Sequence, residues 1–373
     1  MSKISSSFLL HFIQNRFLNT VSTTTLPLPS VSTIQFLTNS CGLSSGSPTS
    51  AGRKLQFDEK HIQQYGAIID FLKSQGFENT QIAKLVSRGP SILQSKVSNN
   101  LKPKFEFLQE IGFVGPLLCK LIVSRPRILN RSLDSQLKPS FFFLKEILES
   151  DEQVTTAIFR YPSLLICDLK GDLKPHIDVL VSEGVPSRNI SKMISLQPRA
   201  IMQKVDRLIP AVKTVKELGI EPKARTFVYA VVVRLSMSDS TWKKKINVMK
   251  SLGWSDKEIF TAFKRHPNYL GCSEEKIRDV ADFCFNTAKL DPGTLISYPK
   301  LFKLSFDKRL RPRYKVLEVL KVKNLLKNKK IASVLVEGER RFVEKYVVKH
   351  LDEIPNLMDI YVGNVEAETK SVL

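Results

Sequence analysis

Apolar residues recur with a helical stagger in several stretches that open with glycine and close with proline. The first stretch is GFENTQIAKLVSRGP, residues 76–90. Its close copies are GFVGPLLCKLIVSRP (112–126), GVPSRNISKMISLQP (184–198) and GWSDKEIFTAFKRHP (253–267). Apolar positions three and four residues apart predict an amphipathic helix in each copy.

The closing prolines form a regular series. A degenerate copy, SDEQVTTAIFRYP, supplies one more of them at Pro162. Pro90, Pro126, Pro162 and Pro198 follow one another at intervals of 36 residues, Pro267 lies 33 residues after position 234, and Pro299 lies 32 residues after Pro267. One period after Pro198 the chain has Arg234 instead of proline. The fifth copy has therefore lost its proline, and the third copy lacks its glycine, so we expect local departures in these two.

A second series of prolines accompanies the first. Its members are Pro103, Pro139, Pro175, Pro210 and Pro312, which follow the first series by 12 or 13 residues. Each opens a further apolar helical pattern, as in LKPKFEFLQEIG, where Leu101, Phe105 and Leu108 fall on one face. The second proline thus predicts the start of a longer helix.

The regular positions of glycine and proline have a physical reason. Proline suits the first turn of a helix, where its missing N–H costs nothing, and glycine suits the left-handed residue just past a helix. Each unit therefore predicts about three helices, and the lack of sustained alternation argues against strands. A unit of this length cannot bury its own apolar face, but stacked units bury a continuous core. We expect an all-α solenoid.

The junctions carry a more specific resemblance. They read GPSIL (89–93), RPRIL (125–129), YPSLL (161–165), QPRAI (197–201), HPNYL (266–270) and YPKLF (298–302). This pattern, followed by L-K-P and an F-L-x-x-x-G helix, resembles the mitochondrial transcription termination factor (mTERF) family. The ending RRFVEKYVVKHLDEIPNLMDIYVG (340–363) is similar to the close of plant members. The resemblance covers roughly residues 60–363, and six junctions in phase make it specific.

The resemblance implies a right- or left-handed superhelical solenoid of three-helix repeats. It also implies binding of double-stranded nucleic acid along a basic concave surface, in an organelle. Members of the family act in transcription termination, transcription regulation or organelle RNA processing. We expect about seven or eight repeats over residues 58–335, and a C-terminal helical cap and tail over 336–373.

The first 57 residues have a different composition. They contain no Asp or Glu, are rich in Ser and Thr, and open with MSKISSSFLLHFIQNRFLN, which can form a basic amphipathic helix. This is typical of an organelle transit peptide, so we expect residues 1–57 to lie outside the fold; a disordered tail is the alternative. The early amphipathic helix favours the mitochondrion, and the Ser/Thr content leaves the chloroplast as the alternative.

The charge points to a polyanionic partner. The chain has 57 Lys and Arg against 36 Asp and Glu, a formal net charge of +21, and a pI of about 9.7. Such an excess attracts nucleic acid first and anionic membrane surfaces second. No apolar run is long enough to predict a membrane span.

Basic residues near the junctions are the candidate contacts. In a solenoid one repeat position recurs on one face, so these residues would form a stripe that follows a phosphate backbone. The candidates are Arg125, Arg127, Arg160, Arg199, Arg234, Arg265 and Lys300, with Arg88 as an outlier in the first unit. A denser C-terminal segment adds Arg311, Arg313, Lys323, Lys329 and Lys330. The alternative for each is an ordinary solvated residue.

Other chemistry finds little support. The five cysteines and five histidines are scattered, without metal or disulfide spacing. No Walker, G-x-G-x-x-G, H-E-x-x-H or G-x-S-x-G motif occurs. Cys119 and Cys167 lie in apolar helical pattern and are expected in the core, as are Trp242, Trp254 and the Phe residues at 141–143, which could otherwise stack on bases. We expect no catalysis, no cofactor, no metal and no small-molecule substrate.

The sequence therefore predicts a monomeric organelle protein that binds double-stranded DNA through a basic concave surface and regulates transcription, with termination as one candidate task. Two alternatives stay open. One is an RNA-binding factor for intron splicing or ribosomal RNA maturation. The other is a protein-interaction scaffold, which the basic excess disfavours.

Overall fold

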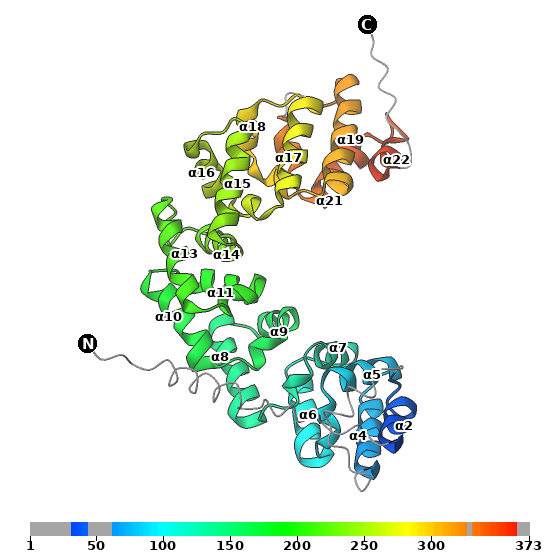
Figure 1. The fold of residues 1–373 in the computed structure, drawn as a ribbon. Coiled ribbons are helices and arrows are strands. Elements are labelled where there is room, and N and C mark those ends of the chain that lie inside the picture. The colour runs from blue at the N-terminus through cyan, green and yellow to red at the C-terminus, as the bar shows by residue number, and fades with distance from the viewer. Residues whose placement is uncertain (1–30, 44–61, 327–329, 364–373) are drawn as a thin grey trace, which may run out of the picture. The chain divides into compact units, whose positions relative to one another are not determined.

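The regular structure of the chain is helical. The computed structural model describes residues 31–43, 62–326 and 330–363, and within these ranges all regular elements are helices, which confirms the all-α prediction. The chain forms two bodies, which we call the N-terminal body (residues 1–138) and the C-terminal body (139–373) (Figure 1).

The N-terminal body holds the first two repeats. Its helices are α2 (Val31–Asn39), α4 (Ile62–Ser74), α5 (Asn79–Arg88), α6 (Lys102–Glu110) and α7 (Pro116–Ser124). Short 3₁₀ or π turns separate them: η2 (Pro90–Gln94), η3 (Val97–Leu101), η4 (Pro126–Ile128) and η5 (Leu133–Leu137). The rings of Phe71 and Phe105 meet edge to face at 5.1 Å between centroids, so α4 and α6 share one core.

The fold begins earlier than the sequence predicted. Helix α2 is followed by Cys41 and Leu43, which are buried together with Leu37, and the ring of Phe36 lies 5.9 Å from that of Tyr65 in α4. The expectation that all of residues 1–57 lie outside the fold is therefore wrong for residues 31–43. Their Ser/Thr-rich composition hid a short apolar face. The amphipathic helix expected at the start of the chain lies outside the described residues.

The C-terminal body continues the same series. Its long elements are α8 (Lys138–Leu148), α9 (Asp151–Arg160), α10 (Lys174–Ser182), α11 (Ser187–Leu196), α13 (Val205–Glu217), α14 (Phe227–Leu235), α15 (Asp239–Ser251), α16 (Asp256–Arg265), α17 (Glu274–Asp282), α18 (Pro292–Ser297) and α19 (Arg311–Val322). Its short turns are η6 (Pro162–Leu165), η7 (Leu169–Leu173), α12 (Pro198–Ile201), η8 (Pro267–Gly271), η9 (Phe283–Thr287), η10 (Pro299–Lys303) and η11 (Phe306–Leu310). The chain closes with α20 (Ile331–Leu335), α21 (Glu339–Phe342), η12 (Val343–Val347), η13 (Val348–His350) and α22 (Leu357–Val362).

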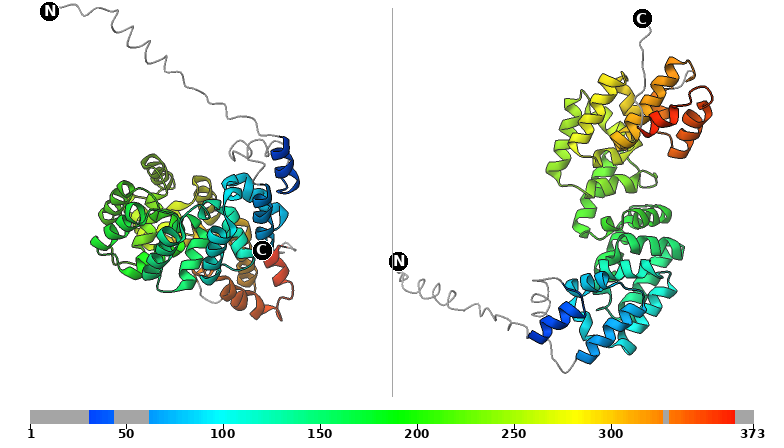
Figure 2. Two further views of the ribbon diagram at one scale, coloured as in Figure 1. Left: turned by 90° about the horizontal axis from the view of Figure 1, so that it is seen from below. Right: turned by 90° about the vertical axis from the view of Figure 1, so that its right-hand side faces the viewer.

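Each junction proline has the place predicted for it. The six prolines from Pro90 to Pro299 open the short elements η2, η4, η6, α12, η8 and η10. Because proline has no N–H to donate, it fits the first position of a helical turn. The repeated sequence motif therefore corresponds to one structural repeat. The long helices of successive repeats lie side by side in chain order, as α15, α17 and α19 show (Figures 1 and 2).

The second proline follows a wide turn in most repeats. In η3 the N–H of Leu101 bonds to Lys96 O at 3.1 Å, and that of Lys102 bonds to Val97 O, both five residues back. Such a π turn lets the helix widen where Pro103 cannot donate. The fourth repeat departs from the prediction, because Pro210 lies inside α13 instead of at its start.

The third repeat shows what the missing glycine costs. Gly112 and Gly184 end their helices with φ of 98° and 80°, in the left-handed region. At the matching place after α8, Glu149 has a φ of 66°. A side chain is strained there, so this repeat keeps the turn at the expense of stability.

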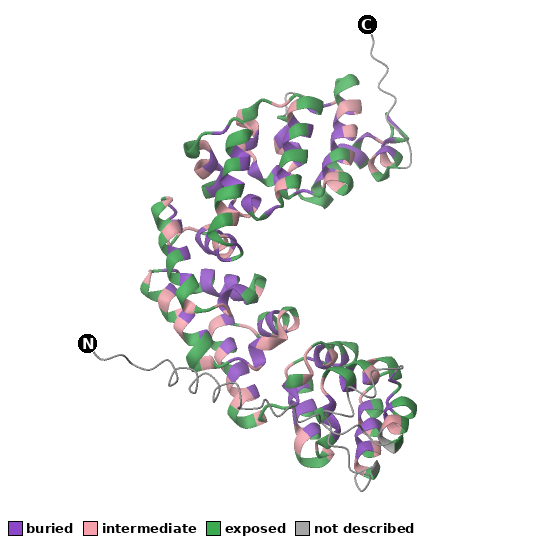
Figure 3. Ribbon diagram, viewed as in Figure 1, coloured by how far each residue is buried: buried purple, intermediate pink, exposed green. Residues whose placement is uncertain are grey.

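The core runs through the repeats along their packed faces. Buried positions lie on the faces that helices turn toward one another, and exposed positions lie on the outer faces (Figure 3). In the C-terminal body, Phe302 contacts Trp254 and Tyr269 across two neighbouring repeats, at 6.2 and 5.7 Å between ring centroids. Apolar contacts between neighbouring repeats are what a solenoid uses for stability.

Candidate nucleic-acid interface

One set of junction cations joins successive repeats. Arg88, Arg160 and Arg265 are the last residues of α5, α9 and α16, each two residues before a junction proline. Their NH1 groups donate to Val123 O at 2.9 Å, Ser195 O at 2.7 Å and Ser297 O at 3.4 Å, near the end of the matching helix in the next repeat. Carbonyls at a helix C-terminus carry partial negative charge and lack intrahelical partners. These arginines therefore have a structural role, although each guanidinium is exposed and keeps further N–H groups for a ligand.

A second set follows the junction proline directly. Arg127, Arg199 and Lys300 occupy this position in the repeats that lack the first arginine. Lys300 donates to Val336 O at 2.9 Å. Arg127 and Arg199 are exposed, and neither side chain has a hydrogen bond or ion pair with any described residue. Each proline junction thus has one cation either two residues before the proline or directly after it. The predicted stripe of cations alternates between these two positions from one junction to the next. Arg125 belongs to neither and is only half exposed.

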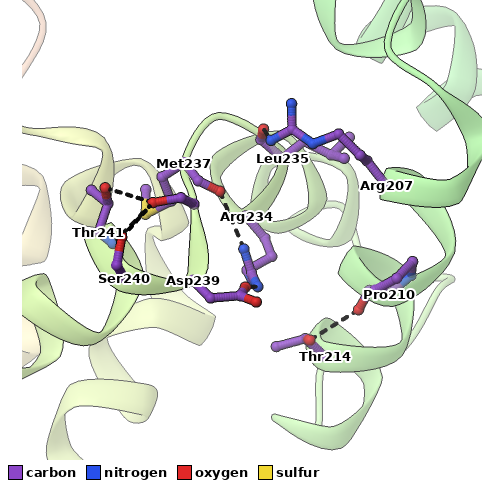
Figure 4. Close-up of polar contacts among 10 residues, drawn as sticks. Arg207, Pro210, Thr214, Arg234, Leu235, Met237, Asp239, Ser240 and Thr241 are labelled. Atoms are coloured by element: carbon purple, nitrogen blue, oxygen red, sulfur yellow. Dashed lines mark hydrogen bonds and ion pairs between the residues drawn. The ribbon is translucent and has the colours of Figure 1, made fainter. Parts of the chain in front are cut away.

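The fifth junction encloses its cation. Arg234 donates NH1 to Met237 O at 3.3 Å and pairs through NH2 with Asp239 (Figure 4). Its guanidinium lies 5.7 Å from the ring centroid of Trp242. Only 15% of the Arg234 side chain is exposed. The side chain replaces the lost proline as the element that holds α14 to α15.

Arg313 requires a correction. It was predicted as a surface contact, but its side chain is completely buried. Its guanidinium donates to Leu335 O and Glu337 O, both at 2.7 Å, pairs with Glu339 at 2.6 Å and stacks on Phe342 at 4.6 Å. Leu335 ends α20, and the other partners lie in the C-terminal cap that follows it, so Arg313 attaches the cap to α19.

Arg313 belongs to a class of buried cations that sequence reasoning missed. Lys104 donates to Leu129 O at 2.6 Å, and Lys245 donates to Cys272 O, in each case to the carbonyl end of the following short turn. Burial lowers the pKa of both lysines. The only sequence signal was position, since Lys104 and Arg313 each directly follow a second-series proline.

The other candidates of the C-terminal basic segment that the structure describes are on the surface. Arg311 stacks on Phe306 at 4.8 Å and pairs with Asp307 at 3.5 Å. Lys323 and Lys330 are exposed. Lys329 lies outside the described residues.

The structure brings two of the predicted residues together. Arg265 and Lys330 line one cavity of about 760 Å³, with Asp291, Thr294 and Tyr298 on its wall. His266, next to Arg265, is half-buried, and burial together with Lys300 and Lys303 lowers its pKa. The neutral form of His266 is therefore favoured, and this residue adds no charge to the junction at neutral pH.

The groups set aside by sequence reasoning are mostly core. Cys119 and Cys167 are buried, and burial raises the pKa of Cys167 to about 12. Trp254 and Phe141 are also buried, whereas Phe142 is 55% exposed. Trp242 is half-exposed, and the guanidinium of Arg234 lies over its ring in a cation–π contact. Phe142 is thus the exposed exception among these aromatics.

The fold defines a class: helical-repeat proteins with a cation at every junction between repeats. A family model described as mTERF matches residues 69–235 and 227–343. The chain therefore belongs to the mTERF family, whose members are nucleic-acid-binding regulators of transcription in organelles. No curated protein matches the chain. Within the described residues, none of the helices has the length and apolar character needed to cross a membrane.

Proposed function

We propose that this protein binds double-stranded DNA in an organelle, most simply the mitochondrion, and regulates transcription there as a monomer. The observation that supports the proposal is the set of junction cations of a chain in this family. The side chains of Arg127 and Arg199 are exposed and have no partner in the described part of the chain, so both are free to meet a phosphate. Regularly placed cations bind a regularly spaced polyanion with little need for base readout.

The basic residues fall into two functional groups. Residues with protein carbonyl partners, such as Arg160 and Arg265, stabilise contacts between repeats and supply charge secondarily. Residues without such partners supply contacts. A test that changes Arg160 and Arg265 would therefore mix a loss of stability with a loss of binding, and Arg127 and Arg199 are the better targets.

The proposal is tested with the full chain and the variant R127Q/R199Q. Affinity for duplex DNA, duplex RNA and single strands is measured by titration at several salt concentrations. We expect the unmodified chain to prefer duplex DNA, with a steep fall in affinity as salt increases. The double variant should bind several-fold more weakly with an unchanged melting temperature.

Other outcomes have distinct meanings. A preference for structured RNA would replace DNA by RNA as the ligand, and intron or ribosomal RNA processing would become the task. No binding to any nucleic acid at low salt would refute the proposal and favour a protein-interaction role. The organelle is tested by imaging a fluorescent fusion of residues 1–60, and fluorescence outside mitochondria would correct the proposed location.

A further inference from the structure

A cavity in the fourth repeat gathers cations from α12 and from the start of α13. It has a volume of about 730 Å³ and lies in the C-terminal body, among the α12 turn, the start of α13 and the end of α14. Arg199, Lys204 and Arg207 line it, together with Tyr161 and Gln197. None of the described residues that line it carries a carboxylate.

Neighbouring cavities differ in this respect. The cavity of about 760 Å³ beside Arg265 and Lys330 includes Asp291. A smaller one, of about 350 Å³, contains Arg207 and Arg234 but also Asp206 and Asp239. In those two cavities the carboxylates compensate the cations. Arg207 lines both this smaller cavity and the fourth-repeat cavity. In the latter, Arg199 and Lys204 have no carboxylate among the described lining residues, so their positive charge is left for a ligand to neutralise.

The cluster does not follow from the repeat architecture alone. Its three cations are the first, sixth and ninth residues after the junction proline Pro198. The other proline junctions have Ser91, Lys96 and Asn99; Arg127, Ser132 and Ser135; Ser163, Asp168 and Gly171; Asn268, Ser273 and Lys276; and Lys300, Ser305 and Lys308 at these places. Each of these five has at most two cations, so the fourth repeat alone has a full set.

The side chains differ in how they are held. Arg207 donates NH2 to Leu235 O at 3.1 Å, which fixes its direction beside the cavity (Figure 4). Arg199 and Lys204 are exposed, and their side chains have no hydrogen bond or ion pair with the described residues. Lys204 also takes the N-cap position of α13, where Ser132, Asp168 and Ser273 of other repeats accept a backbone N–H. A lysine cannot accept one, so it adds positive charge beside amide groups that are already electropositive.

The shape and charge suit a phosphate within a strand. A single phosphate ion would leave most of this volume empty. A phosphodiester with its two flanking sugars fills more of it and is also held in place by the strand on either side. Arginine offers paired donors to phosphate oxygens, and lysine adds a point charge.

We propose that this cavity is the principal phosphate anchor of the chain, and that it seats one phosphodiester of a bound nucleic-acid strand among Arg199, Lys204 and Arg207. The inference rests on the proposed nucleic-acid binding and adds where a strand is held most firmly. The junction cations elsewhere then contribute weaker, distributed contacts.

The test compares two triple variants of the full chain that lose the same charge. The first is R199Q/K204Q/R207Q. The control is K145Q/K174Q/K216Q, which removes three exposed lysines of the same body that pair with Asp151, Asp178 and Glu183. We expect the first variant to lose at least about tenfold in affinity for nucleic acid and the control less than about twofold. The plot of log affinity against log salt should become less steep by roughly 1 for the first variant alone.

A double variant protects the test from a folding artefact. R199Q/K204Q leaves the bond from Arg207 to Leu235 intact, so its melting temperature should match that of the unmodified chain. Its affinity should still fall several-fold. An unchanged affinity in this well-folded variant would overturn the anchor.

The outcomes separate this inference from the function on which it rests. If the unmodified chain binds no nucleic acid at low salt, the proposed function fails. If it binds but the two triple variants lose affinity equally, the function stands and the anchor is refuted. Titration with adenosine monophosphate and with inorganic phosphate tests a free-phosphate ligand. Tight binding of either one that the first triple variant abolishes, with nucleic-acid affinity unchanged, would make the cavity a small-molecule site and also refute the anchor.

Discussion

The fourth and fifth junctions of the chain carry arginines with opposite surroundings. At the fourth, Pro198 opens the short helix α12 and Arg199 is exposed without a partner among the described residues. At the fifth, α14 continues through the place of the proline, and Arg234 turns toward Met237, Asp239 and Trp242. At the fourth junction the proline fixes the backbone by itself, which leaves Arg199 available for a ligand. Where the proline is lost, the cation is used to hold the junction.

The same contrast applies to other cations in the described part of the chain, which are enclosed or open to different degrees. Enclosed cations, such as Arg234 and Arg313, should affect stability, and open ones, such as Arg199, should affect binding. Basic character at a repeated position is therefore insufficient to identify a contact.

The largest effect is expected at the most enclosed cation. Arg313→Met should lower the free energy of unfolding by about 3 kcal/mol or more, because two carbonyls and Glu339 lose a buried charged donor. Denaturant titration followed by circular dichroism measures this loss. A change below about 1 kcal/mol would show that burial of a cation does not mark a structural role.

The partner of Arg313 adds a dependence on pH. Partial burial of Glu339 acts to raise its pKa, but hydrogen bonds from Tyr361, Arg313 and Arg309 outweigh it, and the pKa lies below its ordinary value. A carboxylate with a depressed pKa stabilises the fold above its ordinary pKa, and this contribution is lost as the pH falls through the folded value. The difference in stability between the unmodified chain and the Arg313→Met variant should therefore shrink in acid.

The direct comparison of the two junctions gives the next effect. Arg234→Ala should cost about 2 kcal/mol of stability, since a charged hydrogen bond and a cation–π contact are lost. Its nucleic-acid affinity, measured well below the melting temperature, should stay unchanged. Arg199→Ala is the matched variant and should show the reverse: a stability change within about 0.5 kcal/mol and a loss of affinity. Equal behaviour of the two variants would remove the distinction.

The smallest effect concerns the backbone of the third repeat. Glu149→Gly should relieve left-handed strain of about 1–2 kcal/mol, offset by the greater freedom of glycine in the unfolded chain, for a net gain of about 0.5 kcal/mol. Thermal unfolding measures the gain. Glu146→Gly, inside α8, serves as the control and should destabilise by about 1 kcal/mol. A loss of stability in both variants would mean that Glu149 makes a contact that outweighs its strain.

Much of the fold was predictable because it is repeated. The spacing of Pro90, Pro126 and Pro162 fixed where short turns begin, and glycines such as Gly112 marked the helix ends. Repetition turned weak local signals into a strong one. Helix α2 (Val31–Asn39) was missed because it occurs once and lies in a Ser/Thr-rich stretch. Pro210 was misplaced because its repeat lacks the π turn of the others.

The candidate interface was less predictable. The sequence identified basic junctions, but Arg127, Arg160 and Arg234 look alike in a list of charges. Their roles depend on which carbonyl or carboxylate lies close enough in space to bond to them. For Arg160 this partner is Ser195, which lies 35 residues further along the sequence. The cavity around Arg199, Lys204 and Arg207 depends likewise on the approach of α14, which contributes Leu235 to its wall.

By itself the sequence determined that this protein is an all-helical repeat chain with an excess of positive charge, because proline, glycine and apolar spacing act on the backbone locally. Only the tertiary structure decided which cations are enclosed and which are open. That choice depends on contacts between neighbouring repeats, and a side chain's surroundings are set by what packs against it.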